Sequence, residues 1–220
     1  MTRDRANLIS YLFIIAAVGV AAYLYPSLPD EVPSHWNIDG DVDGYISKPW
    51  GVIVLPLAAI LVFVVMRLIP VISPKGYRTE SFSNVMHIFQ VAMVGFMSLV
   101  AIFALLAANG VDVPMNEVIF GSLGILFVVL GIYVGKIRKN FFLGIRTPWT
   151  LASDEVWERT HRLGGRLLVL HGVILLSGVV VRVPVALLVG MVVVIVLVPV
   201  GYSYWVYRRV EGFGEGDAGE

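Results

Sequence analysis

The stretch of residues 140–165, NFFLGIRTPWTLASDEVWERTHRLGG, decides how this chain is organised. It is polar, aromatic and strongly basic, and it stands between hydrophobic runs long enough to cross a lipid bilayer. A few turn residues would be enough to join two membrane helices. A longer tract that contains arginine, proline, tryptophan and histidine therefore indicates a binding or structural role of its own.

The composition is that of an integral membrane protein. Of the 220 residues 58% are hydrophobic and 15% are charged, and the mean hydropathy is +0.84. A soluble domain carries about a quarter charged residues. The net charge is zero, so the overall balance points to neither acidic partners nor nucleic acid, and we expect no direct nucleic-acid contact. The absence of cysteine excludes disulfides and thiolate metal sites.

Long windows without Asp, Glu, Lys or Arg divide the chain. They cover residues 6–29, 49–66, 81–111, 118–135, 167–181 and 183–207. A bilayer-crossing helix needs roughly 20 mostly apolar residues, and lipid offers the backbone no hydrogen bonds, so such runs must be helical. The window 167–181 is short, but Arg166 and Arg182 can extend their charged ends toward the headgroups. We predict an all-α integral membrane protein with six transmembrane helices.

The first window has an alternative interpretation as a cleaved signal peptide. Arg3 and Arg5 precede it, and small residues occupy much of 16–22. The apolar run continues through Tyr25 without a clear cleavage site, which favours an uncleaved transmembrane helix.

Basic and acidic loops alternate along the chain, which predicts the orientation. The N-terminal tail, the loop 67–82, the segment 136–166 and the end of the last window carry an excess of Lys and Arg. The loop 26–49 and the loop near 109–117 are acidic. We therefore predict a multi-pass cell-membrane protein with both termini and the segment 136–166 in the cytoplasm.

Three parts are predicted on this basis. Residues 1–110 form an N-terminal three-helix half with the acidic outer loop 26–49. Residues 111–210 form a C-terminal half with the cytoplasmic segment 136–166. The Gly-rich acidic tail 211–220 is expected to be disordered.

The outer loop is expected to fold into a small lid. Pro29 and Pro33 stiffen it, and Asn37–Gly40 and Asp43–Gly44 are turn sequences. One interpretation has His35 and Trp36 packing at the interface while the acidic side chains are solvated. Another is ligand recognition by the loop, with candidate residues His35, Trp36, Asn37, Gly40, Asp43 and Gly44. A third is a calcium site at Asp39, Asp41 and Asp43, although the closing Glu of the twelve-residue calcium loop is absent.

Within the cytoplasmic segment, the residue types predict local structure. Pro148 favours extended geometry at Thr147, and Ser153 is a good N-cap for a helix whose first turn holds two acids. The helix from about Asp154 through Arg162 is amphipathic, and we expect it to lie as a short separate helix on the inner leaflet between transmembrane helices four and five. Gly164 and Gly165 would permit a turn there, or a close helix crossing.

The same segment holds candidates for partner recognition. Trp and Arg are enriched in binding hot spots, so Arg146, Trp149, Trp157 and His161 are interpreted as a surface for a peptide or cytosolic protein. The alternative is that Arg146, Arg159 and Arg162 bind lipid headgroups. Both hold if the partner competes with lipid.

Four polar residues fall inside the hydrophobic windows: Asn84, His87, Gln90 and His171. The first three are spaced by three residues and share one side of a helix. Interhelical hydrogen bonding explains them most simply. A metal site of His87, His161 and His171 is an alternative, but no H-E-x-x-H pattern is present, and we expect no metal and no cofactor.

Two other functional classes stay open. An intramembrane enzyme would use His161 or His87 as a base, but no nucleophile–base spacing is visible, and we expect no enzyme. A small-solute or lipid transporter usually keeps a charge near the midplane, and none is present. Helices broken at Pro56 or Pro199 leave transport open.

At these residues the chain resembles a known family. The string N-F-F-L-G-I-R-T-P-W-T-L, followed by Trp157, Thr160, His161, Arg162 and the pair Gly164 and Gly165, closely resembles the C-terminal signature of the SdpI family of bacterial immunity membrane proteins. The outer-loop pattern of Pro29, Pro33, His35, Trp36, Asn37, Gly40 and Gly44 resembles the uncharacterised domain often fused to its N-terminal side.

The resemblance implies a six-helix membrane protein with both termini inside. It also implies protection against a secreted toxin, and relay of the toxin's presence by capture of a cytosolic repressor on the basic inner face. The expected partner-binding residues are Gly144, Arg146, Thr147, Pro148, Trp149, Trp157, Thr160 and His161. The bilayer is the remaining expected partner.

Overall fold

Six long helices lie side by side in the computed structural model, which describes residues 1–74 and 79–212. The helices are α1 (Arg3–Leu24), α2 (Trp50–Ile72), α3 (Ser83–Ala108), α4 (Met115–Val134), the short α5 (Pro148–Ala152), α6 (Asp154–Ser177) and α7 (Val185–Val210). A 3-10 turn, η1 (Glu80–Phe82), precedes α3, and two strands, β1 (Glu31–Trp36) and β2 (Val42–Ser47), connect α1 to α2.

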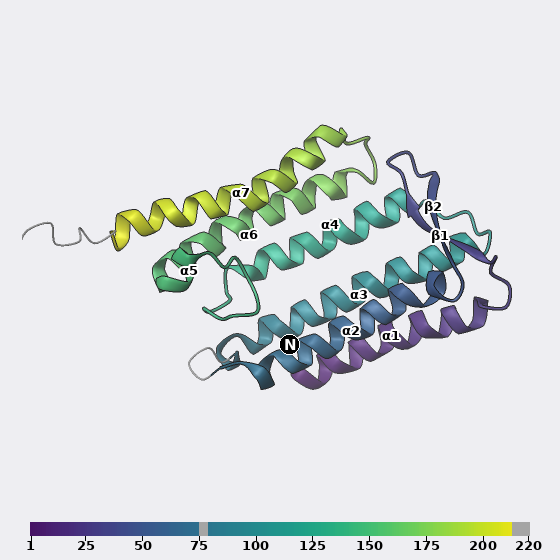
Figure 1. The fold of residues 1–220 in the computed structure, drawn as a ribbon, viewed down its shortest axis with the longest axis horizontal. Coiled ribbons are helices and arrows are strands. Elements are labelled where there is room, and N and C mark those ends of the chain that lie inside the picture. Colours follow the sequence, from purple (N-terminus) through teal and green to yellow (C-terminus); the bar gives the residue numbers. More distant parts are fainter. Residues whose placement is uncertain (75–78, 213–220) are drawn as a thin grey trace, which may run out of the picture.

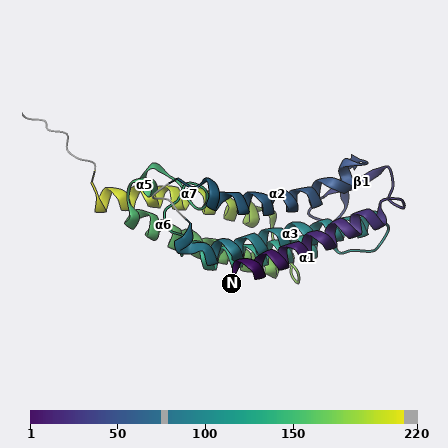
Figure 2. The ribbon, with the colours of Figure 1, turned by 90° about the horizontal axis from the view of Figure 1, so that it is seen from below.

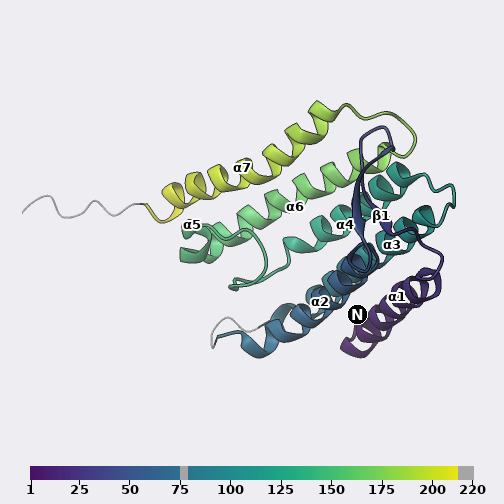
Figure 3. The ribbon, with the colours of Figure 1, turned by 45° about the vertical axis from the view of Figure 1, so that its right-hand side comes forward.

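The helices alternate in direction across a shallow, elongated molecule. Helices α7, α6, α4 and α3 follow one another across it, and α1 and α2 both pack against α3 (Figures 1 and 3). Seen from below, α2 lies over the layer that contains α1 and α3 (Figure 2). Both ends of the described chain lie at the end of the molecule that carries α5, and the strands lie at the opposite end (Figure 1).

Five of these helices are long and apolar enough to cross a membrane: α1, α2, α3 with its preceding 3-10 turn, α4 and α7. The prediction of an integral membrane protein built from apolar helices is thus confirmed. Helix α6 does not meet the same criterion in the described chain, because its first half carries acids and arginines from Asp154 to Arg166. The window 49–66 does extend as a helix past Arg67, ending at Ile72.

The short amphipathic helix expected between the fourth and fifth membrane helices is wrong as a separate element. The predicted start is correct, because the Ser153 side chain accepts a hydrogen bond from the Val156 N–H at 3.4 Å. The helix then continues without a turn through Gly164 and Gly165 to Ser177. The glycine pair serves the other expected purpose, a close helix crossing.

Four glycines form the crossing between α4 and α6, a set called the glycine seam below: Gly124, Gly131, Gly165 and Gly172. A Cβ on Gly131 would lie 2.6 Å from the Gly165 carbonyl oxygen, and a Cβ on Gly165 would lie 2.5 Å from the Gly131 oxygen. About two helical turns further along, a Cβ on Gly172 would lie 2.7 Å from the Gly124 carbonyl oxygen. Small residues allow backbones to approach this closely in membrane helix pairs. Any larger side chain would separate α4 from α6.

The loop between α1 and α2 forms a two-stranded antiparallel hairpin. The turn predicted at Asn37–Gly40 is confirmed, whereas the turn predicted at Asp43–Gly44 is wrong, because both residues lie in β2, which pairs with β1. The Asn37 side-chain oxygen accepts from the N–H groups of Asp39 and Asp41 at 2.9 and 3.0 Å, and Gly40 has φ +92°. The hairpin is the exception to the otherwise helical architecture. We call residues 31–47 the hairpin below.

The division of the chain near residue 110 stays a prediction. Helices α1, α2 and α3 contact one another, α6 contacts both α4 and α7, and α3 packs on α4. The predicted disordered tail lies, from residue 213 onward, outside the described residues, as do Lys75 and Arg78 of the basic loop 67–82.

Replacing Gly131 by Leu should separate α4 from α6, because the added side chain would meet the Gly165 oxygen and the Val169 backbone. Overpacking of this kind costs about 1–3 kcal/mol or more. We expect a lower thermal unfolding midpoint in detergent. Gly190→Leu is the matched control, since no atom lies within 4 Å of a Cβ there. Equal midpoints for the two variants would contradict the seam.

Candidate functional site

The α4–α6 loop, defined here as residues 135–153, folds around a buried asparagine. The Asn140 side-chain oxygen accepts from the N–H groups of Phe142 and Leu143 at 2.8 and 2.7 Å. Its amide nitrogen donates to the carbonyls of Arg138 and Leu143 at 2.9 and 3.1 Å. Asn140 is fully buried, so it supplies hydrogen bonds to a backbone turn that has no ladder of its own.

His161 joins this loop to α6. Its Nε2 accepts a hydrogen bond from the Ile145 backbone N–H at 2.8 Å, and its Nδ1 donates to the Trp157 carbonyl at 2.8 Å. These two bonds define a neutral ring with its proton on Nδ1. Burial lowers the pKa of His161 from 6.5 to about 4, with the Trp157 carbonyl acting weakly in the opposite direction. The ring is therefore uncharged at neutral pH.

Gly144 makes the approach of the loop to His161 possible. It has φ +104°, a conformation that side chains other than glycine rarely adopt, and a Cβ there would lie 2.2 Å from His161 Nε2. Both the backbone angle and the space exclude any other residue in this arrangement.

Trp157 holds the opposite side of the same ring. Its indole stacks on His161 with the ring centroids 4.0 Å apart and an interplanar angle of 21°. Its Nε1 donates to the Ile137 carbonyl at 2.7 Å. Trp157 thus ties the start of the loop to α6, while His161 ties its middle.

The short helix α5 connects the loop to α7. Thr147 and Thr150 form a reciprocal capping box, with the Thr150 N–H donating to Thr147 Oγ1 at 3.1 Å and the Thr147 N–H donating to Thr150 Oγ1 at 2.8 Å. Thr147 has the predicted extended geometry. Its hydroxyl also lies 3.0 Å from the hydroxyl of Ser203 on α7. The capping residue is therefore also an interhelical contact.

The predicted partner-binding residues divide into two groups by exposure. Thr147, Trp157, Thr160 and His161 are buried, and three of them hold the loop through the contacts above; the Thr160 hydroxyl has no hydrogen-bond partner in the described structure. Gly144, Arg146 and Pro148 are exposed and Trp149 is half-buried. The exposed group is the part of the loop that is accessible at the surface of the protein.

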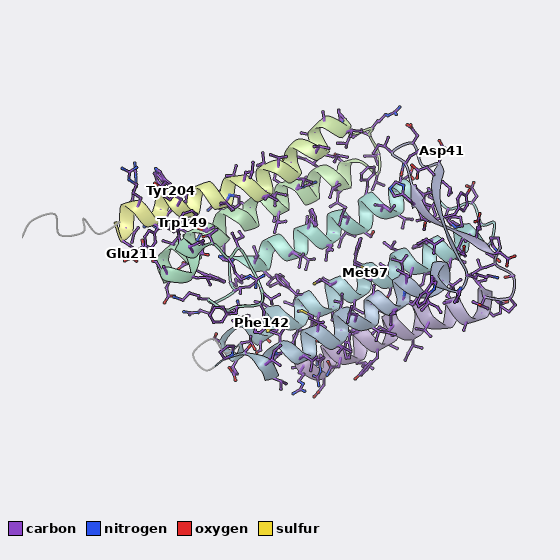
Figure 4. The ribbon with its side chains drawn as sticks, viewed as in Figure 1. Asp41, Met97, Phe142, Trp149, Tyr204 and Glu211 are labelled. Carbon is purple, nitrogen blue, oxygen red and sulfur yellow. The ribbon has the colours of Figure 1, made fainter. Side chains whose placement is uncertain are left out.

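Trp149 and Arg146 are each held in place by a contact with another residue. Trp149 packs edge-on against Tyr204 of α7 with the ring centroids 5.1 Å apart, and the two rings are neighbours at the α5 end of the molecule (Figure 4). The Arg146 guanidinium donates to the Phe141 carbonyl. Lys136 lies over the Tyr133 ring. The result is an exposed basic and aromatic surface on a braced support.

A cavity of about 500 Å³ lies beside this surface. It is lined by residues 135–139 of the loop together with Asp154, Trp157 and Glu158. Lys139 pairs with Asp154 across it at 2.7 Å, while Arg138 is exposed. Lys136 and Arg138 are thus two further exposed cations of the same loop.

The polar residues of α3 bond to α1 and to the residue at the N-terminus. Gln90 donates to Ser10 Oγ of α1 at 3.0 Å, His87 Nδ1 lies 3.2 Å from the Met1 carbonyl, and the Met1 ammonium lies 3.5 Å from Asn84. Gln90 therefore forms an interhelical hydrogen bond, whereas His87 and Asn84 contact Met1, which precedes α1. His171 is elsewhere, edge-on to Phe127 of α4 at 5.2 Å.

In the described chain, no three His, Asp or Glu side chains gather as a metal site would require. The ring nitrogens of His161 are both engaged by backbone groups. Asp39 of the suggested calcium loop is paired with Arg182 at 2.5 Å.

The predicted outer-loop residues all lie in the hairpin. His35 and Asp43 pair with each other on adjacent strands, and a Cβ on Gly44 would lie 2.9 Å from the His35 Cβ. Trp36 lines a cavity of about 100 Å³ shared with α2 and α3. Two contacts hold the tip of the hairpin. Asn116 of α4 donates to the Ile38 carbonyl at 2.7 Å, and Arg182 of the turn between α6 and α7 pairs with Asp39.

Known sequences match both of these regions. Residues 136–203 match the SdpI/YfhL protein family, a span that includes the α4–α6 loop from Lys136, all of α6, and Ser203. This C-terminal part of the chain is similar to the SdpI/YfhL family. Residues 12–60, which include the hairpin, match a domain of unknown function (DUF1648). The family resemblance carried by the G-I-R-T-P-W-T string is confirmed.

A similar protein of known name aligns with nearly the whole chain. The Immunity protein SdpI of Bacillus subtilis (strain 168) is 24% identical over 212 residues, which are 94% of this chain and 99% of that protein. No solved structure matches the chain. The similarity thus extends over both the hairpin and the α4–α6 loop.

The neutral His161 ring predicts a pH dependence of stability. In the unfolded chain the ring takes up a proton with the ordinary pKa of 6.5, whereas the folded protein resists protonation until about pH 4. Its contribution is therefore complete above pH 6.5 and is lost as the pH falls toward 4. At one pKa unit per about 1.4 kcal/mol, the loss reaches at most about 3 kcal/mol.

We expect the unfolding midpoint of the natural protein to fall more steeply between pH 6.5 and 4.5 than that of His161→Gln, whose side chain keeps an acceptor but does not titrate. Thermal unfolding in a pH series measures this. Identical slopes for the two proteins would show that His161 does not control the effect.

Proposed function

We propose that this chain is a membrane immunity protein, which protects the cell that makes it from a secreted toxic protein. The supporting observation is the similarity to Immunity protein SdpI over 94% of the chain. Five helices of the described chain are long and apolar enough to cross a membrane, as a membrane protein requires. The proposal does not require catalysis.

The proposed topology has six crossings, with α6 as the fifth in order and both termini in the cytoplasm. Neighbouring long helices run antiparallel, and both described ends lie at the α5 end (Figure 1). That end carries the basic loop 135–153 and Arg208 and Arg209 of α7, whereas the other end carries the acidic hairpin. Cytoplasmic loops of membrane proteins are rich in Lys and Arg.

The hairpin is the proposed outer recognition element. Asp41 and Tyr45 are exposed on it, and its tip is held by Asn116 and Arg182. An exposed acidic and aromatic surface on a fixed support suits recognition of a basic toxin, because complementary charge steers association.

The exposed group of the α4–α6 loop is the proposed inner capture surface. Arg146, Pro148 and Trp149 stand on a base braced by His161 and by the contact of Trp149 with Tyr204. Rigid aromatic and arginine anchors dominate the energy of many protein interfaces. The proposed partner is a cytosolic repressor that is held at the membrane when the toxin is present.

The immunity proposal is tested by survival in mixed culture. Cells lacking this chain, grown with their unmodified parent, should lose at least about tenfold in viable count, and expression of the chain should restore it. Asp41→Lys should restore less, because it reverses an exposed charge at the hairpin tip. Asp112→Lys, an exposed acid in the α3–α4 turn at the same end, is the matched control. Unchanged survival of the cells lacking the chain would refute the proposal.

The capture proposal is tested by location. A fluorescent fusion of a repressor encoded beside this chain should move to the membrane during exposure to the toxin, and Arg146→Ala with Trp149→Ala should abolish the movement. Arg208→Ala, an exposed arginine at the end of α7, serves as control. Membrane levels and unfolding midpoints of both variants report on folding. Movement that survives the double substitution would remove these residues from the surface.

A further inference from the structure

Two arginines of α6 form a ridge between two open clefts. Arg162 and Arg166 line a cleft of about 400 Å³ toward α7, which Arg159 and Tyr202 complete. The same two arginines line a second cleft of about 360 Å³ toward α4, beside His161. The guanidinium groups are exposed to these clefts and are not packed into the protein.

The ridge lies near the ends of the charge-free runs of α6 and α7. Tyr202, which faces the arginines, lies in the charge-free run of α7 and six residues before Arg208. At about 1.5 Å per residue, the cleft begins about 9 Å inside the charged end of α7. On α6, the charge-free run starts immediately after Arg166. Under the proposed topology, the ridge thus lies where headgroups meet hydrocarbon.

Two of the three arginines that line the cleft toward α7 have an acidic partner, and the third has none among the described residues. Arg159 pairs with Glu155 at 2.5 Å, and Arg162 pairs with Glu158. Arg166 has no ion-pair or hydrogen-bond partner within residues 1–74 and 79–212. His161 at the second cleft is uncharged at neutral pH. Unpaired cations at the headgroup boundary attract anionic headgroups, so the cleft favours an anionic ligand.

Further along both helices, away from α5, exposed apolar side chains follow the residues that line the cleft. Leu170 and Val173 of α6 are 51% and 53% exposed, and Leu197 and Val198 of α7 are 61% and 43% exposed. A soluble phosphate would use the arginines alone. A ligand with a phosphate and long apolar chains would use both the arginines and this surface.

We propose that the cleft between α6 and α7 binds an anionic phospholipid, with its phosphate held by Arg166 and Arg162. The Tyr202 hydroxyl supplies a third donor, and the acyl chains lie along the exposed apolar side chains of α6 and α7. This site rests on the proposed membrane topology and not on the identity of any toxin or repressor.

The test measures lipid retention by the purified full chain. Nanodiscs are assembled from phosphatidylcholine with a small fraction of phosphatidylglycerol, and lipid that co-purifies after transfer to detergent is counted by native mass spectrometry. We expect Arg166→Gln to retain at least about fivefold less phosphatidylglycerol than the natural protein. Arg208→Gln, an exposed arginine outside the cleft, should retain the natural amount.

Three outcomes would overturn the site. Undiminished retention by Arg166→Gln would show that the arginine does not bind lipid. Equal losses in both variants would show general attraction between cations and anionic lipid. Displacement of the lipid by millimolar inorganic phosphate would identify a soluble-phosphate site. Unfolding midpoints confirm that both variants fold, and a failed survival assay in mixed culture would leave the lipid result unaffected.

Discussion

The hydrogen bond from the Ile145 N–H to His161 Nε2 is the contact on which the α4–α6 loop depends. A loop with little regular structure must still pair its buried backbone groups. One neutral imidazole meets that requirement twice, by accepting from Ile145 and donating to Trp157. A charged ring would lose its acceptor and would be poorly solvated, so protonation of His161 would destabilise the loop.

Two sets of glycines let this bond form. The glycine seam brings α4 close to α6, which fixes where the loop begins and ends. Gly144 then lets the loop backbone reach the imidazole. The helix crossing and the loop geometry are therefore one constraint, and a larger side chain at either place would displace Trp157 and His161 together.

The sequence predicted the helices well, because charge-free windows in lipid have one stable backbone structure. It predicted the turn at Asn37–Gly40, whose residues have local preferences, but not the two strands that this turn joins. The separate amphipathic helix was wrong because periodicity does not show whether an apolar face meets lipid or another helix. In α6, the side chains of Val156, Trp157 and Thr160 are buried within the protein.

The same limit applies to the site. Arg146 and Trp149 are exposed enough to bind a partner, but Trp157 and His161 are buried supports. Residue type alone suggested a surface, since tryptophan suits both roles. Asn140 was present in the decisive stretch, yet its four hydrogen bonds come from a turn that no periodic pattern predicts. The contact of Thr147 with Ser203 joins positions 56 residues apart, which local preferences do not relate.

The continuity of α6 has a mechanical consequence. Its 24 residues form one rod of about 36 Å, and no kink-forming proline interrupts it. The turn that follows Ser177 contains Arg182, which pairs with Asp39 of the hairpin. The other half of α6 contains His161, which bonds to the α4–α6 loop. Because α6 is unbroken, any tilt of this helix would move both of its ends together.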